Sequence, residues 1–174
     1  MNFRILLIAG LFFLFTNSFA QEVNKKYKDP KLEKQVLVGY CDTTGLKQGV
    51  FGVYYNTQFE VYKPKLKVVK SIGAITEKGG FEFVTLFGDW CSDSKLQLGR
   101  FDKVLDEAGV DLSKRTYIAV DRSKKVPNMD ISKYKLLRVP TFIVLYHGEE
   151  VGRIVESADN TLEKDLLKIL KSKE

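Results

Sequence analysis

The stretch FEFVTLFGDWCSDS, residues 81–94, carries the strongest structural signal in the chain. Residues 81–87 are β-prone and mostly apolar, as expected for a buried central strand. The polar residues 88–90 then turn the chain, and apolar residues at helical spacing follow between 98 and 108. The stretch therefore predicts a strand, a tight turn and a helix, with Cys91 at the helix N-terminus.

Three further strands are predicted downstream, at residues 116–120, 142–146 and 150–155. The short turn between the last two indicates an antiparallel hairpin. A strand, a crossover helix and a second strand form a right-handed parallel unit. The pattern thus predicts an α/β protein with a central mixed sheet, and we expect helices on both of its faces. These include a short helix at 130–137 and a last helix capped by Asn160.

The segment before residue 81 is harder to interpret. Residues 35–40 suggest a strand, and aromatic and aliphatic residues at steps of three to four between 54 and 69 suggest helical segments. We therefore divide the chain into a signal peptide at 1–20, an N-terminal extension at 21–80 and the main domain at 81–174.

The first 20 residues have the features of a signal peptide. Arg4 precedes an apolar run at residues 5–15, and Ser18 and Ala20 are small residues placed for cleavage after Ala20. A membrane-spanning helix needs about 20 apolar residues, so this run is too short to span. We expect a bacterial protein exported to the periplasm or secreted, with no stable membrane insertion after cleavage.

Composition excludes several classes of function. The formal net charge is +6 over 174 residues, and we interpret the basic residues as solvated surface, so nucleic-acid binding is not expected. One histidine and two distant cysteines provide no metal cage. We predict no metal, no cofactor and a monomer.

Cys91 is the main candidate for chemistry. The positive end of a helix dipole stabilises a thiolate at the helix N-terminus. Ser94, one turn later, is placed to donate a hydrogen bond to the sulfur, whereas the charges of Asp89 and Asp93 tune its reactivity, with Asp93 opposing the thiolate if it is close. The alternative is an inert buried cysteine, against which the polar flanking residues argue.

Residues 83–94 resemble the active-site strand and turn of the thioredoxins, with Trp-Cys-Ser-Asp-Ser in place of Trp-Cys-x-x-Cys. Residues 138–142, Arg-Val-Pro-Thr-Phe, resemble the cis-proline loop of that family. The resemblance covers roughly residues 81–170 and is closest to exported bacterial proteins with a Trp-Cys-x-Asp-Ser motif. It implies a thioredoxin fold in which Cys91 is catalytic. It also implies substrate contacts at Trp90, Val139, Pro140 and Thr141.

Three positions depart from the family pattern. Ser94 replaces the second motif cysteine, so it cannot release a mixed disulfide. Thr85 stands where thioredoxins have a buried aspartate, and Gly99 replaces a helix-kinking proline but still permits a bend. Cys41 lies outside the resemblance. It is either a small structural residue or a resolving partner of Cys91, and pairing requires the two Cα atoms to lie within about 7 Å.

We therefore expect a protein that exchanges thiols and disulfides through one cysteine, as an isomerase or by removing adducts. Its partners would be protein thiols and disulfides or low-molecular-weight thiols. The alternative is a non-catalytic thioredoxin-fold module that binds extended chains, as a chaperone does. A dithiol reductase that uses Cys91 with Cys41 is the third possibility.

Overall fold

The computed structural model describes residues 22–173, so the predicted signal peptide lies outside the described residues. In chain order the elements are β1 (Lys26–Asp29), β2 (Lys34–Leu37), β3 (Gly39–Cys41), α1 (Thr43–Leu46), α2 (Gly49–Val61), α3 (Leu66–Thr76), β4 (Phe81–Phe87), α4 (Ser92–Glu107), the 3-10 helix η1 (Leu112–Lys114), β5 (Arg115–Ala119), the 3-10 helix η2 (Ser132–Tyr134), β6 (Thr141–Tyr146), β7 (Glu149–Val155) and α5 (Leu162–Lys171).

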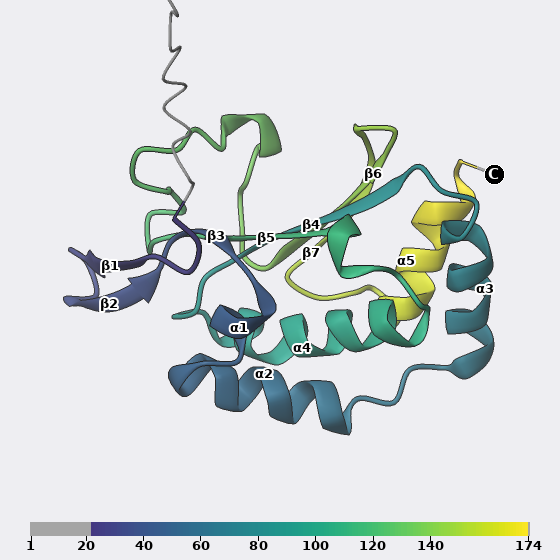
Figure 1. Ribbon diagram of the computed structural model, residues 1–174, viewed down its shortest axis with the longest axis horizontal. Coiled ribbons are helices and arrows are strands. Elements are labelled where there is room, and N and C mark those ends of the chain that lie inside the picture. Colours follow the sequence, from purple (N-terminus) through teal and green to yellow (C-terminus); the bar gives the residue numbers. More distant parts are fainter. Residues whose placement is uncertain (1–21, 174) are drawn as a thin grey trace, which may run out of the picture.

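A mixed five-stranded sheet organises residues 22–173, in the order β3-β5-β4-β6-β7 (Figure 1). β4 and β5 pair in parallel, and α4 is the crossover that connects them along the chain. β6 and β7 form the predicted antiparallel hairpin. β4 also pairs with β6 antiparallel, and β3 lies antiparallel to β5 at one edge. The α/β class and the central mixed sheet are as predicted.

The α-helices gather on one face of this sheet, where they bury the larger part of the core (Figure 1). Phe83 of β4, Phe101 of α4 and Phe142 of β6 are fully buried there, and the rings of Phe101 and Phe142 stack with their centroids 4.2 Å apart. Leu166 of α5 and Ile72 of α3 join the same cluster. Burial of aromatic and aliphatic side chains on this face holds the helices to the sheet.

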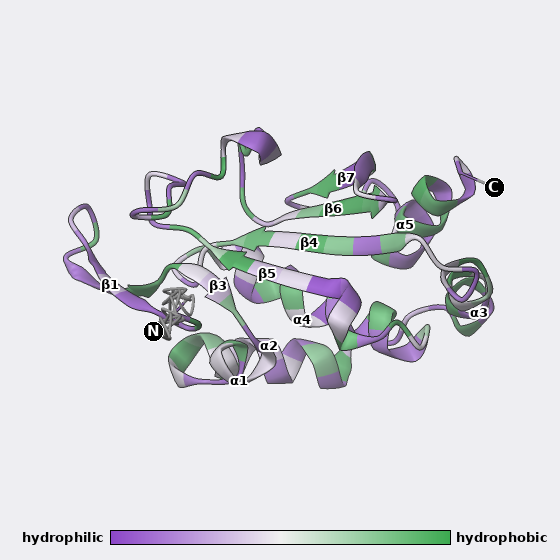
Figure 2. Ribbon diagram, turned by 45° about the horizontal axis from the view of Figure 1, so that its top comes forward, coloured by the Kyte–Doolittle hydropathy of each residue, from purple (hydrophilic) through white to green (hydrophobic). Residues whose placement is uncertain are grey.

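We expected helices on both faces of the sheet, but the opposite face is covered in another way. Residues 121–139 cross it as an irregular segment, and the expected helix at 130–137 is reduced to the 3-10 turn η2 (Figures 1 and 2). Lys135 follows η2 with a left-handed backbone, at φ 47°, which ends the helical turn. Val126 and Ile131 anchor the segment by packing on Leu86 and Ile118 of the sheet.

The start of α5 also differs from the prediction. The N-cap is Thr161 rather than Asn160. The side chain of Asn160 instead donates a hydrogen bond to Asp165, whose carboxylate also accepts the backbone N–H of Asp159 at 2.7 Å. A first-turn carboxylate thus satisfies the N–H groups that precede this helix.

The N-terminal extension shares the core of the main domain. It supplies strand β3, and helix α2 packs along α4. Gly99 permits this packing, because a Cβ at this position would lie 2.3 Å from the carbonyl oxygen of Tyr55. Gly99 therefore permits a close approach between two helices, a role that the family pattern did not indicate. Tyr62 further ties the extension to α5 by donating a hydrogen bond of 2.8 Å to Glu163.

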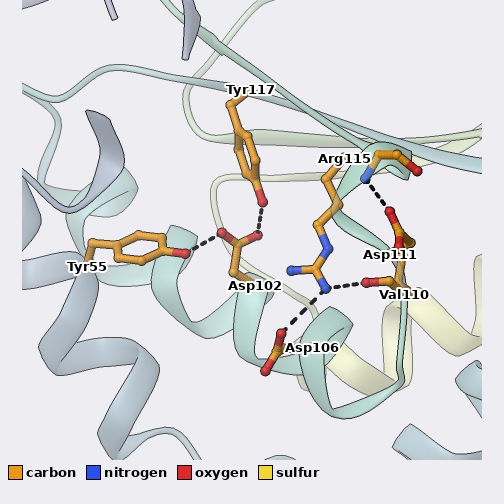
Figure 3. Close-up of polar contacts among 8 residues, drawn as sticks. Tyr55, Asp102, Asp106, Val110, Asp111, Arg115 and Tyr117 are labelled. Atoms are coloured by element: carbon orange, nitrogen blue, oxygen red, sulfur yellow. Dashed lines mark hydrogen bonds and ion pairs between the residues drawn. The ribbon is translucent and has the colours of Figure 1, made fainter. Parts of the chain in front are cut away.

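A buried carboxyl group joins α2, α4 and β5 (Figure 3). Asp102 is fully buried and accepts hydrogen bonds from the hydroxyls of Tyr55, at 2.7 Å, and Tyr117, at 2.9 Å. The guanidinium of Arg115 lies nearby and contacts Asp106 and the Val110 carbonyl. Burial raises the pKa of Asp102 from 3.8 to about 6, although the two hydroxyls and Arg115 favour the charged form.

This raised pKa predicts an unusual pH dependence of stability. Because the folded state holds the Asp102 proton more tightly than the unfolded state, this group stabilises the fold below pH 3.8 and loses that contribution as the pH rises through about 6. The contribution is roughly 3 kcal/mol at most. Relative to Asp102→Asn, the wild type should therefore gain free energy of unfolding between pH 7 and pH 4, as measured by urea denaturation. The exposed Glu82→Gln variant is the control, and a pH-independent difference for Asp102→Asn would contradict the account.

Candidate active site

The end of β4 and the start of α4 present Cys91. The residue occupies the N-cap position of α4 with an extended backbone, at φ −85° and ψ 131°. Its N–H donates to the Gly88 carbonyl at 3.0 Å, and its carbonyl accepts from the N–H of Lys95 at 3.1 Å. Its side chain makes no capping hydrogen bond and is partly exposed. The sulfur therefore lies at the positive end of a 16-residue helix and remains reachable from solvent.

The loop before β6 faces this cysteine. The Cys91 Sγ lies 3.3 Å from the carbonyl oxygen of Val139, to which the thiol donates. The Val139–Pro140 peptide bond is cis, as predicted. The side chains of Val139, Pro140 and Thr141 are buried, and the Thr141 hydroxyl donates to the Arg138 carbonyl at 2.7 Å. The hydrogen bond between this loop and the thiol is therefore made by a backbone carbonyl.

Trp90 is held on one side of the turn. Its Nε1 donates to the carbonyl of Val120 at 2.8 Å, at the end of β5, so the indole is fixed to the sheet. The guanidinium carbon of Arg122 lies 4.6 Å from the centroid of the ring, within the range of a cation–π contact. The Trp90 indole and the Arg122 guanidinium therefore lie together beside Cys91.

Asp89 connects this turn to the N-terminal extension. Its Oδ2 accepts the N–H of Leu37 at 3.0 Å, whereas its Oδ1 is buried and has no hydrogen-bond partner among the described residues. Burial raises the pKa of Asp89, an effect that the Leu37 N–H and the charges of Lys34 and Lys95 oppose. Asp93, by contrast, is exposed in the first turn of α4.

We expected Ser94 to donate a hydrogen bond to the Cys91 sulfur, but the structure places its hydroxyl elsewhere. Its side chain is fully buried, and its hydroxyl oxygen accepts the N–H of Gly88 at 3.2 Å. Within residues 22–173, no hydrogen bond joins Ser94 to Cys91. The hydroxyl thus closes the turn that leads to Cys91, and its influence on the thiol is through backbone position.

Cys41 is separated from Cys91 by the sheet. Both thiols are free, and Cys41 packs beneath α2 with Phe51, whereas Cys91 packs against the cluster on the opposite face. Burial raises the pKa of Cys41 to about 12. A buried, protonated thiol on the far face is a poor resolving nucleophile.

A groove of about 520 Å³ opens beside the Cys91 sulfur. The residues that line it come from the β1–β2 turn, the start of α4, both ends of the irregular segment and the end of β7: Leu32, Trp90, Cys91, Ser92, Asp93, Arg122, Lys124, Leu137, Arg138, Val139 and Glu156. No motif in the sequence indicated the contributions of Arg122, Lys124 and Leu137. The signal available was the concentration of basic residues between 121 and 139.

Comparisons with known proteins place the fold. No protein-family model and no curated protein matches the chain. A Pseudomonas aeruginosa protein of unknown function shares 15% identity over 74% of this chain and 86% of its own, with a TM-score of 0.51. An HIV epitope scaffold shares 14% identity over 72% and 85%, with a TM-score of 0.50. The thioredoxin of Fasciola hepatica shares 20% identity over 58% and 88%, with a TM-score of 0.38.

The likenesses to the Pseudomonas aeruginosa protein and to the epitope scaffold show a shared fold. All three identities are too low to transfer an activity, and the first two titles name none. None of the helices within residues 22–173 has the length and apolar character needed to cross a membrane.

The position of Ser94 gives a direct test of the turn. Ser94→Ala leaves the buried Gly88 N–H without its acceptor, which should lower the free energy of unfolding by about 1–3 kcal/mol. Ser92→Ala, two residues away and exposed, should change it by less than about 0.5 kcal/mol. Urea denaturation of both variants checks this, and equal effects would show that the Ser94 hydroxyl does not stabilise the turn.

Proposed function

We propose that this protein exchanges thiols and disulfides through Cys91 alone. The observation that carries the proposal is the meeting of three features: a partly exposed thiol, the N-terminus of a long helix and the backbone of a cis-proline loop. The groove beside the thiol gives a substrate access to the sulfur. We further propose that the protein is exported, because disulfide substrates form in oxidising compartments.

The proposed reaction begins when the Cys91 thiol loses its proton to solvent. The thiolate attacks one sulfur of a substrate disulfide, so a Cys91–substrate disulfide forms and the second substrate sulfur leaves as a thiolate, which takes up a proton. The backbone of Val139 lies beside the attacking sulfur, where an extended substrate chain can align. The cation–π pair of Trp90 and Arg122 borders the same site.

The second step needs a thiol from elsewhere. Ser94 carries no thiol and is buried against Gly88, and Cys41 lies under α2 on the other face of the sheet. If a second thiol of the substrate attacks the mixed disulfide, Cys91 is released and the substrate disulfide is rearranged without net redox change. If an external low-molecular-weight thiol attacks the substrate sulfur, Cys91 is again released and the substrate carries the adduct. This arrangement favours isomerisation or the transfer of adducts over net reduction.

A second candidate function is a non-catalytic module that binds extended chains. Leu137 favours it, because this residue lines the groove with 79% of its surface exposed. An exposed apolar side chain beside a backbone edge suits binding of partly folded chains, and such binding requires no turnover.

Trapping the mixed disulfide separates the two candidates. We expect the Cys41→Ala variant, mixed with a peptide disulfide, to form a one-to-one covalent adduct that intact-mass spectrometry detects. The adduct should persist until an external thiol is added, because the chain contains no other resolving group. Cys91→Ala, which keeps Cys41, is the matched control and should form none.

Two results would contradict single-cysteine exchange. If the folded Cys41→Ala variant forms no adduct, the binding module becomes the better account. If the wild type releases its adduct without added thiol while Cys41→Ala retains it, Cys41 takes part and the protein is a dithiol enzyme.

A further inference from the structure

We propose that the Cys91 groove and a neighbouring lysine-rimmed pocket on residues 121–139 together bind an acidic and apolar segment of a polypeptide substrate. This inference rests on the proposed function, because it names the class of disulfide substrate that reaches Cys91. The site that it adds lies on the irregular segment that covers one face of the sheet.

The two hollows are neighbours that share lining residues. The second has a volume of about 460 Å³, and it shares Lys124 and Leu137 with the groove beside Cys91. Its apolar lining is Val126, Met129, Ile131, Leu136 and Leu137. Two neighbouring hollows that share an exposed leucine fit successive side chains of an extended chain, whereas a small thiol would occupy only the hollow beside Cys91.

The lining of the second pocket is anchored rather than loose. Val126 and Ile131 are buried against the sheet in the same cluster as Leu86 and Ile118. Asp121 holds the start of the segment by accepting the N–H groups of Ser123 and Lys125. The apolar floor is therefore built before a ligand arrives, which lowers the entropic cost of binding.

The charge of the segment selects the ligand. Residues 121–139 contain six basic and two acidic residues, a net charge of +4 within a chain whose net charge is +6. Arg138 is paired with Glu156, but Lys124, Lys125 and Lys135 form no ion pair with any residue of the described chain. These three lysines line the second pocket together with one acidic residue, Asp130. An apolar floor with a basic rim is complementary to a segment in which apolar and acidic side chains lie close together.

The backbone conformation of Lys124 and Lys135 allows their charges to be removed while the fold of the segment is kept. Lys124 and Lys135 have left-handed backbones, at φ 60° and 47°. Asparagine tolerates this conformation better than most residues, so Lys124→Asn and Lys135→Asn should keep the fold of the segment. With Lys125→Gln they make a triple variant without the rim charge. Lys67→Gln, Lys164→Gln and Lys171→Gln together remove the same charge from exposed positions outside both hollows and serve as the matched control.

Peptide binding to the Cys91→Ala protein tests the pocket without the chemistry. The probes are labelled synthetic peptides that alternate leucine with glutamate, with glutamine or with lysine, and fluorescence anisotropy reports their affinity. We expect the glutamate peptide to bind roughly tenfold more tightly than the glutamine peptide, because its glutamates can form three exposed ion pairs with the lysines of the rim. The rim variant should lose this preference and the control variant should keep it. Equal affinity for the three peptides, or equal loss in both variants, would overturn the proposal.

Cystine-linked versions of the same peptides separate this proposal from the function it rests on. If the glutamate peptide binds preferentially but Cys91 forms no adduct with any peptide, exchange fails and the acidic-apolar site stands. If Cys91 forms adducts with all three peptides at the same rate, exchange stands and the acidic-apolar site is overturned.

Discussion

The pairing of β4 with β6 is the constraint on which the site depends. The antiparallel register places Leu86 opposite Thr141, so the end of β4 and the start of β6 lie at the same edge of the sheet. The turn from Gly88 to Cys91 and the Val139–Pro140 loop leave from that edge, and the thiol therefore meets the Val139 carbonyl. A slip of this register by one residue would reverse the faces of the strand and separate the two groups. The hydrophobic side chains that fix the register thus also place Cys91 beside the Val139 carbonyl.

The uneven covering of the sheet determines which surface borders Cys91. The helices bury the Phe83, Phe101 and Phe142 cluster on one face, and this face also contains Asp102 and Cys41. On the other face, the segment 121–139 forms an anchored but irregular surface that borders the thiol. The larger part of the core and the proposed ligand contacts therefore lie on different faces. The N-terminal extension contributes to both, because α2 packs on α4 and Leu37 holds Asp89 at the active-site turn.

The sequence predicted correctly those elements whose structure is set by residues close together in the chain. The strand at 81–87 and the position of Cys91 at a helix N-terminus follow from contiguous patterns, and the cis bond before Pro140 was implied by the thioredoxin resemblance. The sequence failed where a long-range neighbour decides the role of a residue. Ser94 turns its hydroxyl to Gly88, and Gly99 serves the approach of α2, which the motif around Cys91 does not contain. The prediction of a helix at 130–137 was wrong, because Lys135 has a left-handed backbone and ends the helical segment after one turn. The groove could not be foreseen because it joins segments far apart in the chain, although the charge of residues 121–139 was visible.

The central claim is that the fold prepares Cys91 to react. The most direct measurement is the rate of alkylation by iodoacetamide in the Cys41→Ala variant at neutral pH, folded and in denaturant, followed by intact-mass spectrometry. If the helix terminus and the open groove activate the thiol, Cys91 should react at least as fast in the folded protein as in the unfolded chain. A thiol that reacts only after unfolding would contradict the account and would make Cys91 a structural residue.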